Sequence, residues 1–245
     1  MRKSNIWRVL AAIFASLFIL AAEVPSSVVK AASLSSNVGE LNRYVEQLQR
    51  TINSHQLSKP YALYNKMKKS YSETKQRVER LKDGTVKQQY RERLKKADRT
   101  IRQVAYYISA IESGERLIAL TSRIDQSLTL GRVEEVYDVY PSFDEQLKKT
   151  KFLIQKVSGS TVRRQMTETY VHLAKTMKQR AFYPMNIMLA FDGILAAYEQ
   201  EDIAKAERLL LLCEQWLPHV KDAKAKAALS RYLEEFQAPV ILGVQ

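Results

Sequence analysis

Residues 85–130 read TVKQQYRERLKKADRTIRQVAYYISAIESGERLIALTSRIDQSLTL, and this stretch decides the fold. Apolar residues recur in it at steps of three and four from Tyr90 to Ile111, which is the spacing of one face of an α-helix. Gly114 is its only glycine, and it contains no proline. We therefore predict one continuous helix, about 69 Å long at 1.5 Å per residue, which Gly131 ends.

The apolar stripe of this helix changes direction at Gly114. Beyond that glycine it resumes out of step, at Leu117, Leu120 and Ile124. A helix of about 69 Å is too long for one compact domain. We therefore expect its two halves to serve two successive helical bundles.

The remainder of the chain shows the same helical spacing and no sustained alternation typical of strands. Seven glycines and six prolines in 245 residues leave few turns. Pro141 and Pro184 are expected to break or kink their helices, and Ser160 to act as an N-cap. The other expected helices span about 37–56, 60–82, 132–157, 161–200, 203–217 and 222–236. The chain also contains a weak internal repeat at an offset of 70 residues. In both copies, at 132–136 and 202–206, a shorter helix begins directly after an overlong one.

These patterns predict an all-α fold, an elongated rod of three consecutive three-helix bundles, coiled-coil-like, that share long contiguous helices. The bundles would comprise residues 32–112, 113–182 and 183–238, followed by a short tail at 239–245.

The first 31 residues have the features of a secretory signal peptide. Arg2, Lys3 and Arg8 precede an uncharged run at 9–22, and cleavage is expected after Ala31. The whole chain has 39 Lys or Arg and 26 Asp or Glu, a net charge of +13. Cleavage would leave 35 basic and 25 acidic residues, or +10. We therefore expect a secreted protein of the cell wall or surface with an acidic partner that is not nucleic acid.

The basic charge is concentrated in residues 59–102, which contain 15 Lys or Arg and five Asp or Glu. Helical spacing places Lys68, Lys75 and Lys82 along one flank, and a second row on the following helix. That second row is Arg91, Lys95, Arg99 and Arg102. Six tyrosines lie in or near the same region: Tyr61, Tyr64, Tyr71, Tyr90, Tyr106 and Tyr107. The spacing favours Tyr64, Tyr71 and Tyr90 as core residues, while the other three are less constrained.

No pattern indicates an enzyme. The single Cys213 and three histidines cannot supply a Cys/His metal site, and no glycine-rich phosphate loop or nucleophile elbow is present. Pairs such as Glu134 with Asp138 are ordinary on helix surfaces. We expect no catalytic residues, no metal or other cofactor and no small-molecule substrate.

Four segments carry a resemblance to a known family: YALYNKMKKSY at 61–71, residues 131–141 with their Tyr140-Pro141 ending, residues 157–164, and AKAE at 204–207 followed by Trp216-Leu-Pro218. Over about residues 37–236 the chain resembles the α-helical N-terminal region of SbsC-type S-layer proteins of Gram-positive bacilli. The resemblance implies a rod of triple-helical bundles that binds an anionic secondary cell wall polysaccharide.

Basic and tyrosine residues of the first bundle are implied to hold that polymer. The positions that match are Tyr61, Tyr64, Lys66, Lys68, Lys69 and Tyr71. Spacing adds Lys75, Arg91, Lys95, Arg99 and Arg102, and Tyr106 is added as a less constrained tyrosine of the same region. We expect a monomeric, non-catalytic wall-binding protein. The alternatives are a membrane-surface or signal-anchored scaffold that binds anionic lipid, which requires an uncleaved signal peptide or a lipid partner, and an enzyme acting on wall glycans.

Overall fold

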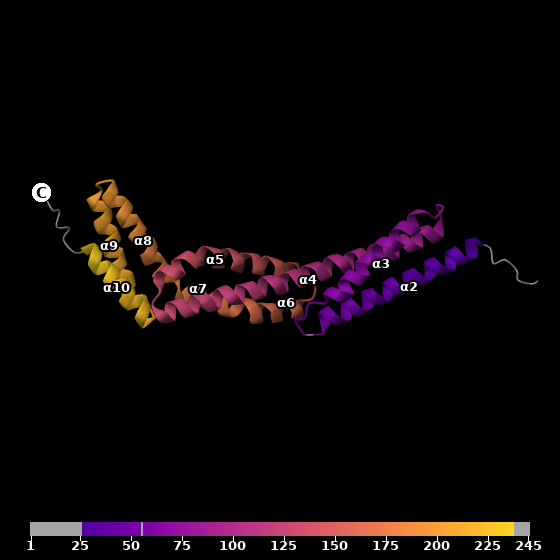
Figure 1. The fold of residues 1–245 in the computed structure, drawn as a ribbon, viewed down its shortest axis with the longest axis horizontal. Coiled ribbons are helices and arrows are strands. Elements are labelled where there is room, and N and C mark those ends of the chain that lie inside the picture. Colours follow the sequence, from indigo (N-terminus) through magenta and orange to yellow (C-terminus); the bar gives the residue numbers. More distant parts are fainter. Residues whose placement is uncertain (1–25, 55, 238–245) are drawn as a thin grey trace, which may run out of the picture. The chain divides into compact units, whose positions relative to one another are not determined.

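A computed structural model describes residues 26–54 and 56–237 of the chain, and those residues contain helices and turns but no β-strand (Figure 1). The all-α prediction is confirmed. The helices, in chain order, are α2 (Ser26–Asn53), α3 (Tyr61–Glu79), α4 (Thr85–Leu130), α5 (Val133–Lys156), α6 (Ser160–Met166), the π-helical turn η1 (Thr167–Val171), α7 (His172–Arg180), α8 (Phe182–Glu199), α9 (Ile203–Trp216), the 3₁₀ turn η2 (Leu217–His219) and α10 (Ala223–Gln237).

Helix α4 has the bounds predicted from its sequence. Helix α2 begins at Ser26, well before the expected start near Asn37. Most of the expected signal peptide and the expected tail at 239–245 lie outside the described residues.

The described residues form two compact units. Unit 1 comprises residues 26–47 and 62–99, and unit 2 comprises residues 48–61 and 100–237. The expected division into three bundles stays a prediction.

Unit 1 is a three-helix core built from one stripe of each helix. The buried side chains are short or branched for the most part, and they recur at the three-four spacing that the sequence shows. They are Leu34, Val38, Leu41 and Val45 of α2, Met67, Thr74 and Val78 of α3, and Leu94 and Ala97 of α4. The flanks of α3 on either side of this stripe are therefore the surfaces available to a partner.

In unit 2, α4 is buried on more than one side around Gly114. A Cβ added at Gly114 would lie 2.3 Å from Cγ of Tyr170, so the tyrosine ring occupies the space of the missing side chain. Tyr170 belongs to the π-helical turn η1, whose extra residue per turn reorients side chains within a helix. The sequence-predicted change of face at Gly114 thus coincides with a close helix contact.

The expected overlong helix at 161–200 is interrupted. Its two parts meet at Ala181 with a bend of 49°. Pro184 is the third residue of α8, and it has no N–H to donate to the carbonyl of Arg180. The predicted kink therefore exists, but it lies three residues before the proline. Ala181 N–H still donates to Met177 O at 2.9 Å, which keeps the two parts joined by helical hydrogen bonds.

Two other local predictions need correction. The break expected at Pro141 does not occur, because α5 continues through it, and the alternative of a kink stays a prediction. Ser160 is the first residue of α6, whose N-cap is Gly159 at φ +88° with no side-chain cap.

The repeat at an offset of 70 is visible in the backbone. Arg132 N–H donates to Ser127 O, and Asp202 N–H donates to Ala197 O, both at 2.9 Å. The preceding residues, Gly131 and Glu201, have φ of +76° and +56°. Both turns are Schellman motifs, in which a left-handed residue ends the helix.

Among the described residues no single helix is long and apolar enough to cross a membrane, although the bent pair 160–180 and 182–199 together has the length and composition to do so.

Two of the helical glycines, Gly39 and Gly114, should respond oppositely to alanine. Gly39 in α2 has no atom within 4 Å of an added Cβ. Gly39→Ala should therefore raise the free energy of unfolding by about 0.5–1 kcal/mol through helix propensity. Gly114→Ala should instead lower it by about 1–3 kcal/mol, since the new methyl group overpacks the site of Tyr170. Urea unfolding followed by circular dichroism measures both, and equal effects would contradict the close contact.

Candidate functional site

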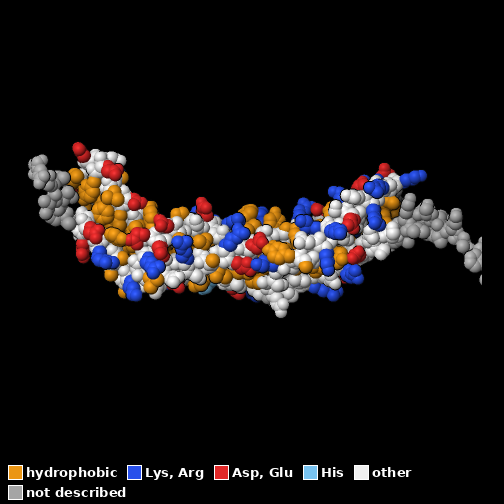
Figure 2. Space-filling view, in the orientation of Figure 1, with side chains coloured by type: hydrophobic (Ala, Val, Ile, Leu, Met, Phe, Trp, Pro, Cys, Tyr) orange, Lys and Arg blue, Asp and Glu red, His pale blue; other side chains and the backbone are white. Residues whose placement is uncertain are grey.

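Unit 1 carries most of the net charge of the described residues. It contains 15 Lys or Arg and seven Asp or Glu, a net +8. Unit 2 has 21 basic and 18 acidic residues among those described, a net +3. Figure 2 shows Lys and Arg side chains spread over the helices of unit 1. Like charges at this density repel one another, so an anion bound here would relieve repulsion.

One of these basic residues has a structural role. Lys87 is only 7% exposed, and its Nζ donates to Glu79 O at 3.1 Å and to Leu81 O at 3.0 Å. It also forms an ion pair with Asp83 at 3.1 Å. Lys87 therefore caps the carboxyl end of α3, where a positive charge is favoured.

Two of the predicted site residues have acidic neighbours. Arg91 Nη2 donates to Glu79 Oε2 at 2.8 Å, and this hydrogen bond holds the pKa of the Glu79 carboxyl below its usual range. Lys95 donates to Glu92 at 2.8 Å, one turn away on α4. Both pairs are exposed, where ion pairs contribute about 0–1 kcal/mol, so both cations remain available to a ligand.

A cleft of about 190 Å³ runs between α3 and α4, and we call it the α3–α4 cleft. Its lining residues are Tyr71, Lys75 and Glu79 of α3 and Arg91, Leu94, Lys95 and Asp98 of α4. Four of the predicted site residues, two from each helix, thus line one cleft. Tyr71 and Leu94 give the cleft apolar surface between three cations and two carboxylates.

Further residues of the predicted site lie on α3 outside the α3–α4 cleft, on the side of the helix that lines it. Tyr64, Lys68, Tyr71 and Lys75 follow one another at steps of four, three and four, so they form one stripe on the helix. Lys68 Nζ lies 5.3 Å from the ring centroid of Tyr64, within the range of a cation–π contact. Burial raises the pKa of the Tyr64 hydroxyl. Both tyrosines are half-buried and can present a ring edge to solvent.

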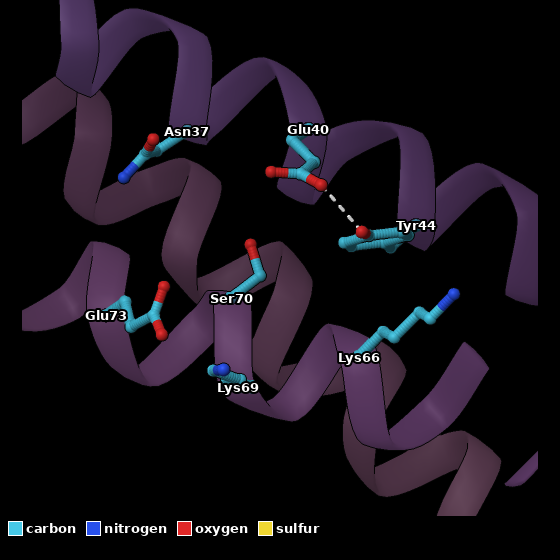
Figure 3. A pocket seen from close by; sticks show the side chains of 7 residues that line it. All are labelled: Asn37, Glu40, Tyr44, Lys66, Lys69, Ser70 and Glu73. Atoms are coloured by element: carbon cyan, nitrogen blue, oxygen red, sulfur yellow. Dashed lines mark hydrogen bonds between the residues drawn. The ribbon is translucent and has the colours of Figure 1, made fainter. Parts of the chain in front are cut away.

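A second cleft, of about 160 Å³, lies on the opposite flank of α3 (Figure 3). This α2–α3 cleft is lined by Asn37, Glu40 and Tyr44 of α2 and by Lys66, Lys69, Ser70 and Glu73 of α3. The Tyr44 hydroxyl donates to Glu40 Oε1 at 2.6 Å, which fixes the position of that carboxylate and raises the pKa of the tyrosine.

The other predicted site residues lie elsewhere. Arg99 is exposed in unit 1, whereas Tyr61, Arg102 and Tyr106 belong to unit 2. The Tyr61 hydroxyl donates to Glu112, and this bond raises the pKa of Tyr61. Tyr61 therefore presents its ring rather than its hydroxyl.

Tyr107 is structural, which helical spacing did not indicate. Only 1% of this residue is exposed, and its hydroxyl donates to Gln56 O at 3.0 Å. It therefore anchors the segment before α3 instead of facing a ligand.

The α2 side of the α2–α3 cleft was not predicted from the sequence. Asn37, Glu40 and Tyr44 follow helical steps of three and four beside the buried stripe of α2, so a helical-wheel comparison of the two helices could have found them.

Cys213 is buried, and burial raises the pKa of its thiol to about 11, so it is inert at neutral pH. Within residues 26–54 and 56–237, no group of three or more His, Cys, Asp or Glu is placed to hold a metal ion.

Comparison with known families gives a match to a family model described as the SbsC C-terminal domain, over residues 45–175. That range is more than half of the chain. An S-layer protein of Geobacillus stearothermophilus is 23% identical over 173 residues, which are 66% of this chain and 14% of that protein.

Solved structures give the same relationship. The crystal structure of the N-terminal part of the bacterial S-layer protein SbsC has a TM-score of 0.72 at 19% identity, covering 84% of this chain and 54% of that one. The crystal structure of the S-layer protein rSbsC(31–844) also has a TM-score of 0.72 at 19% identity, covering 84% of this chain and 31% of that one. At this identity the structural likeness shows the fold. Together these matches confirm the resemblance seen in the sequence.

Replacing Lys87 by methionine should destabilise unit 1. The aliphatic stem is kept, but two carbonyls at the end of α3 lose their donor, which should cost about 1–3 kcal/mol of unfolding free energy. Lys82→Met is the matched control, because Lys82 is exposed nearby, and its effect should stay within about 0.5 kcal/mol. Urea unfolding followed by circular dichroism compares the two; equal stabilities would show that Lys87 is not a cap.

Proposed function

Because the chain belongs to the SbsC C-terminal domain family and is similar to an S-layer protein, we propose that it is a non-catalytic cell-surface protein that binds an anionic wall polysaccharide through unit 1. The chain spans 14% of that S-layer protein and 54% or less of the solved chains named above, so the proposal concerns the residues present in this sequence.

The α3–α4 cleft is the observation that carries this proposal. It is lined by Lys75, Arg91 and Lys95 together with Tyr71. Lys and Arg bind carboxylate or phosphate groups by charge-assisted hydrogen bonds, and Arg can do so with two parallel bonds. A tyrosine ring offers a flat apolar face and a polar edge, which suits a sugar ring.

The stripe of Tyr64, Lys68, Tyr71 and Lys75 supports a chain-like ligand over a compact one. Lys68 and Lys75 are seven residues apart, which is about 10.5 Å along the helix axis. No carboxylate of the described residues lies within 4.0 Å of either ammonium group. A polymer lying along α3 would therefore meet two unpaired cations and two aromatic rings in alternation.

The proposed localisation is the cell wall surface, reached by secretion. The expected signal peptide supports this, as does the likeness to an S-layer protein. A wall polymer is the acidic partner that an exported, basic protein meets.

Removing the cations of the α3 and α4 rows should abolish wall binding. We propose the variant Lys68→Gln, Lys75→Gln, Arg91→Gln, Lys95→Gln and Arg99→Gln in the full chain. Wall sacculi of the producing bacterium are incubated with it and sedimented, before and after chemical removal of the secondary polymer. The original chain should pellet only with polymer-bearing sacculi, and the variant with neither.

A matched control removes the same charge from unit 2. Arg116, Arg123, Lys149, Lys151 and Lys175 are all exposed, and their replacement by Gln should leave pelleting within about twofold, in line with exposed residues outside a site. Equal binding of the original chain to stripped and unstripped sacculi would refute the proposal. Binding to anionic vesicles instead of sacculi would support the lipid alternative, and release of glycan fragments would support an enzyme.

Salt should weaken the interaction strongly. The cations are exposed, and the Debye length falls from about 10 Å at 0.1 M salt to about 3 Å at 1 M. The fraction that pellets with sacculi should therefore drop steeply between about 0.1 and 1 M sodium chloride. Circular dichroism at the same salt concentrations and constant pH checks that the chain stays folded. Undiminished pelleting at the highest salt would mean that apolar stacking, not charge, dominates.

A further inference from the structure

The α2–α3 cleft differs from the α3–α4 cleft in its balance of charge. It has two lysines and two carboxylates, whereas the α3–α4 cleft has three cations and two carboxylates, one of which, Glu79, is bonded to Arg91. Lys66 and Lys69 lie on α3, and the carboxylates of Glu40 and Glu73 lie on α2 and α3 respectively. No ion pair within 4.0 Å joins either lysine to either carboxylate. Lys69 and Glu73 are four residues apart, a spacing at which helical ion pairs form readily. Lys66, Lys69 and Glu73 are thus left to interact with a ligand, while Glu40 forms an exposed ion pair with Arg43 at 3.8 Å through the same oxygen that accepts the Tyr44 hydroxyl, so its other oxygen faces a ligand.

The cleft also holds neutral hydrogen-bonding groups. Figure 3 shows the Ser70 hydroxyl pointing into the gap between α2 and α3, with Glu40 and Glu73 on either side of it. Glu40 is held by the hydroxyl of Tyr44 at 2.6 Å. The carboxylates therefore line the cleft itself, where a ligand would meet them.

A purely anionic group does not match this arrangement. It would be attracted by two ammonium groups and repelled by two carboxylates, so the net electrostatic gain would be small. A group that carries an ammonium beside an acidic substituent can satisfy both sets of charges. The volume of about 160 Å³ is well below that of pockets for drug-sized ligands, about 300–1,000 Å³. It therefore suits one unit of a polymer.

We propose that the α2–α3 cleft binds a sugar unit of the wall polymer that carries a free ammonium group next to its acidic group. This inference rests on the proposed function. Glu40 and Glu73 receive the ammonium, Lys66 and Lys69 receive the acidic group, and Ser70 bonds a ring hydroxyl. The two clefts then recognise different groups of the polymer. The α3–α4 cleft binds its negatively charged groups, and the α2–α3 cleft binds units that carry a free amine.

The sign of a mutational effect tests the inference. In the double variant Glu40→Gln and Glu73→Gln, loss of two negative charges would tighten binding of a purely anionic polymer. For an amine-bearing polymer the same change should weaken binding roughly threefold or more, since exposed ion pairs are worth up to about tenfold in affinity together. The amide oxygen introduced by Glu40→Gln can still accept the Tyr44 hydrogen bond, so the cleft keeps its shape. The control is Glu92→Gln, which removes an exposed carboxylate of α4 and should bind as tightly as the original chain or more tightly.

The ligand side is tested with the polymer released from sacculi of the producing bacterium, used as isolated and after N-acetylation with acetic anhydride. Isothermal titration of the full chain should show roughly a threefold or greater loss of affinity on acetylation. The Glu40→Gln, Glu73→Gln variant should bind both polymer forms equally.

The outcomes separate the two proposals. If the original chain binds both polymer forms equally, or the double variant binds more tightly, the amine inference is overturned while polymer binding stands. If the original chain does not bind the released polymer in either form, the proposed function fails and the inference fails with it.

Discussion

The contact between Gly114 and Tyr170 is the constraint on which unit 2 depends. Helix α4 can be buried on several sides near its middle only because Gly114 has no side chain where the tyrosine ring packs. The π-helical turn at 167–171 brings that ring to the right position on the opposing helix. The same helix continues to Thr85 with a different buried face, so one uninterrupted element supplies side chains to both units. The backbone hydrogen bonds of α4 therefore stay regular along its whole length. The missing side chain of Gly114, rather than a break in the helix, makes room for the helix that packs there.

The charge of unit 1 is divided between structure and surface. Lys87 is used to cap α3, and Arg91 and Lys95 have exposed acidic neighbours. Lys66, Lys68, Lys69 and Lys75 of α3 have no carboxylate within 4.0 Å among the described residues. A helix with one apolar stripe and two basic flanks therefore stands between two clefts. The core stripe fixes which residues face each cleft, since side chains of a helix keep their angular order.

Much of the fold could be predicted from local sequence. Gly131, whose left-handed φ of +76° ends the regular backbone, sets the carboxyl end of α4, and Gly84 directly precedes its first residue; both glycines are visible in the sequence. Two expectations drawn from single residues differ from the structure: α5 continues through Pro141 without a break, and Gly159 takes the cap position that Ser160 is expected to occupy. Such outcomes depend on tertiary packing, which overrides propensity.

The candidate site could be predicted in part. Periodicity placed Lys75, Arg91 and Lys95 on the flanks of two successive helices, and they line one cleft. Tyr71, which the spacing favours as a core residue, is half-buried and lines the same cleft. Periodicity did not predict the carboxylates of the α2–α3 cleft. The spacing within a helix shows which of its residues share a flank, but it does not show which flank of a neighbouring helix lies opposite them.

The two Schellman turns at an offset of 70 differ in one respect that bears on how such a chain can change. At Gly131 an added Cβ would lie 2.8 Å from the backbone oxygen of Lys224 in α10, so a neighbouring helix demands glycine there. At the equivalent position Glu201 has the same left-handed backbone but keeps a large, exposed side chain. The geometry of the turn is therefore common to both copies, whereas the requirement for glycine belongs only to the copy that another helix covers. If the two turns arose by duplication of a 70-residue module, the turn at Gly131 would tolerate no other residue, whereas the turn at Glu201 would tolerate many. New exposed side chains could then evolve at residue 201 without loss of the fold.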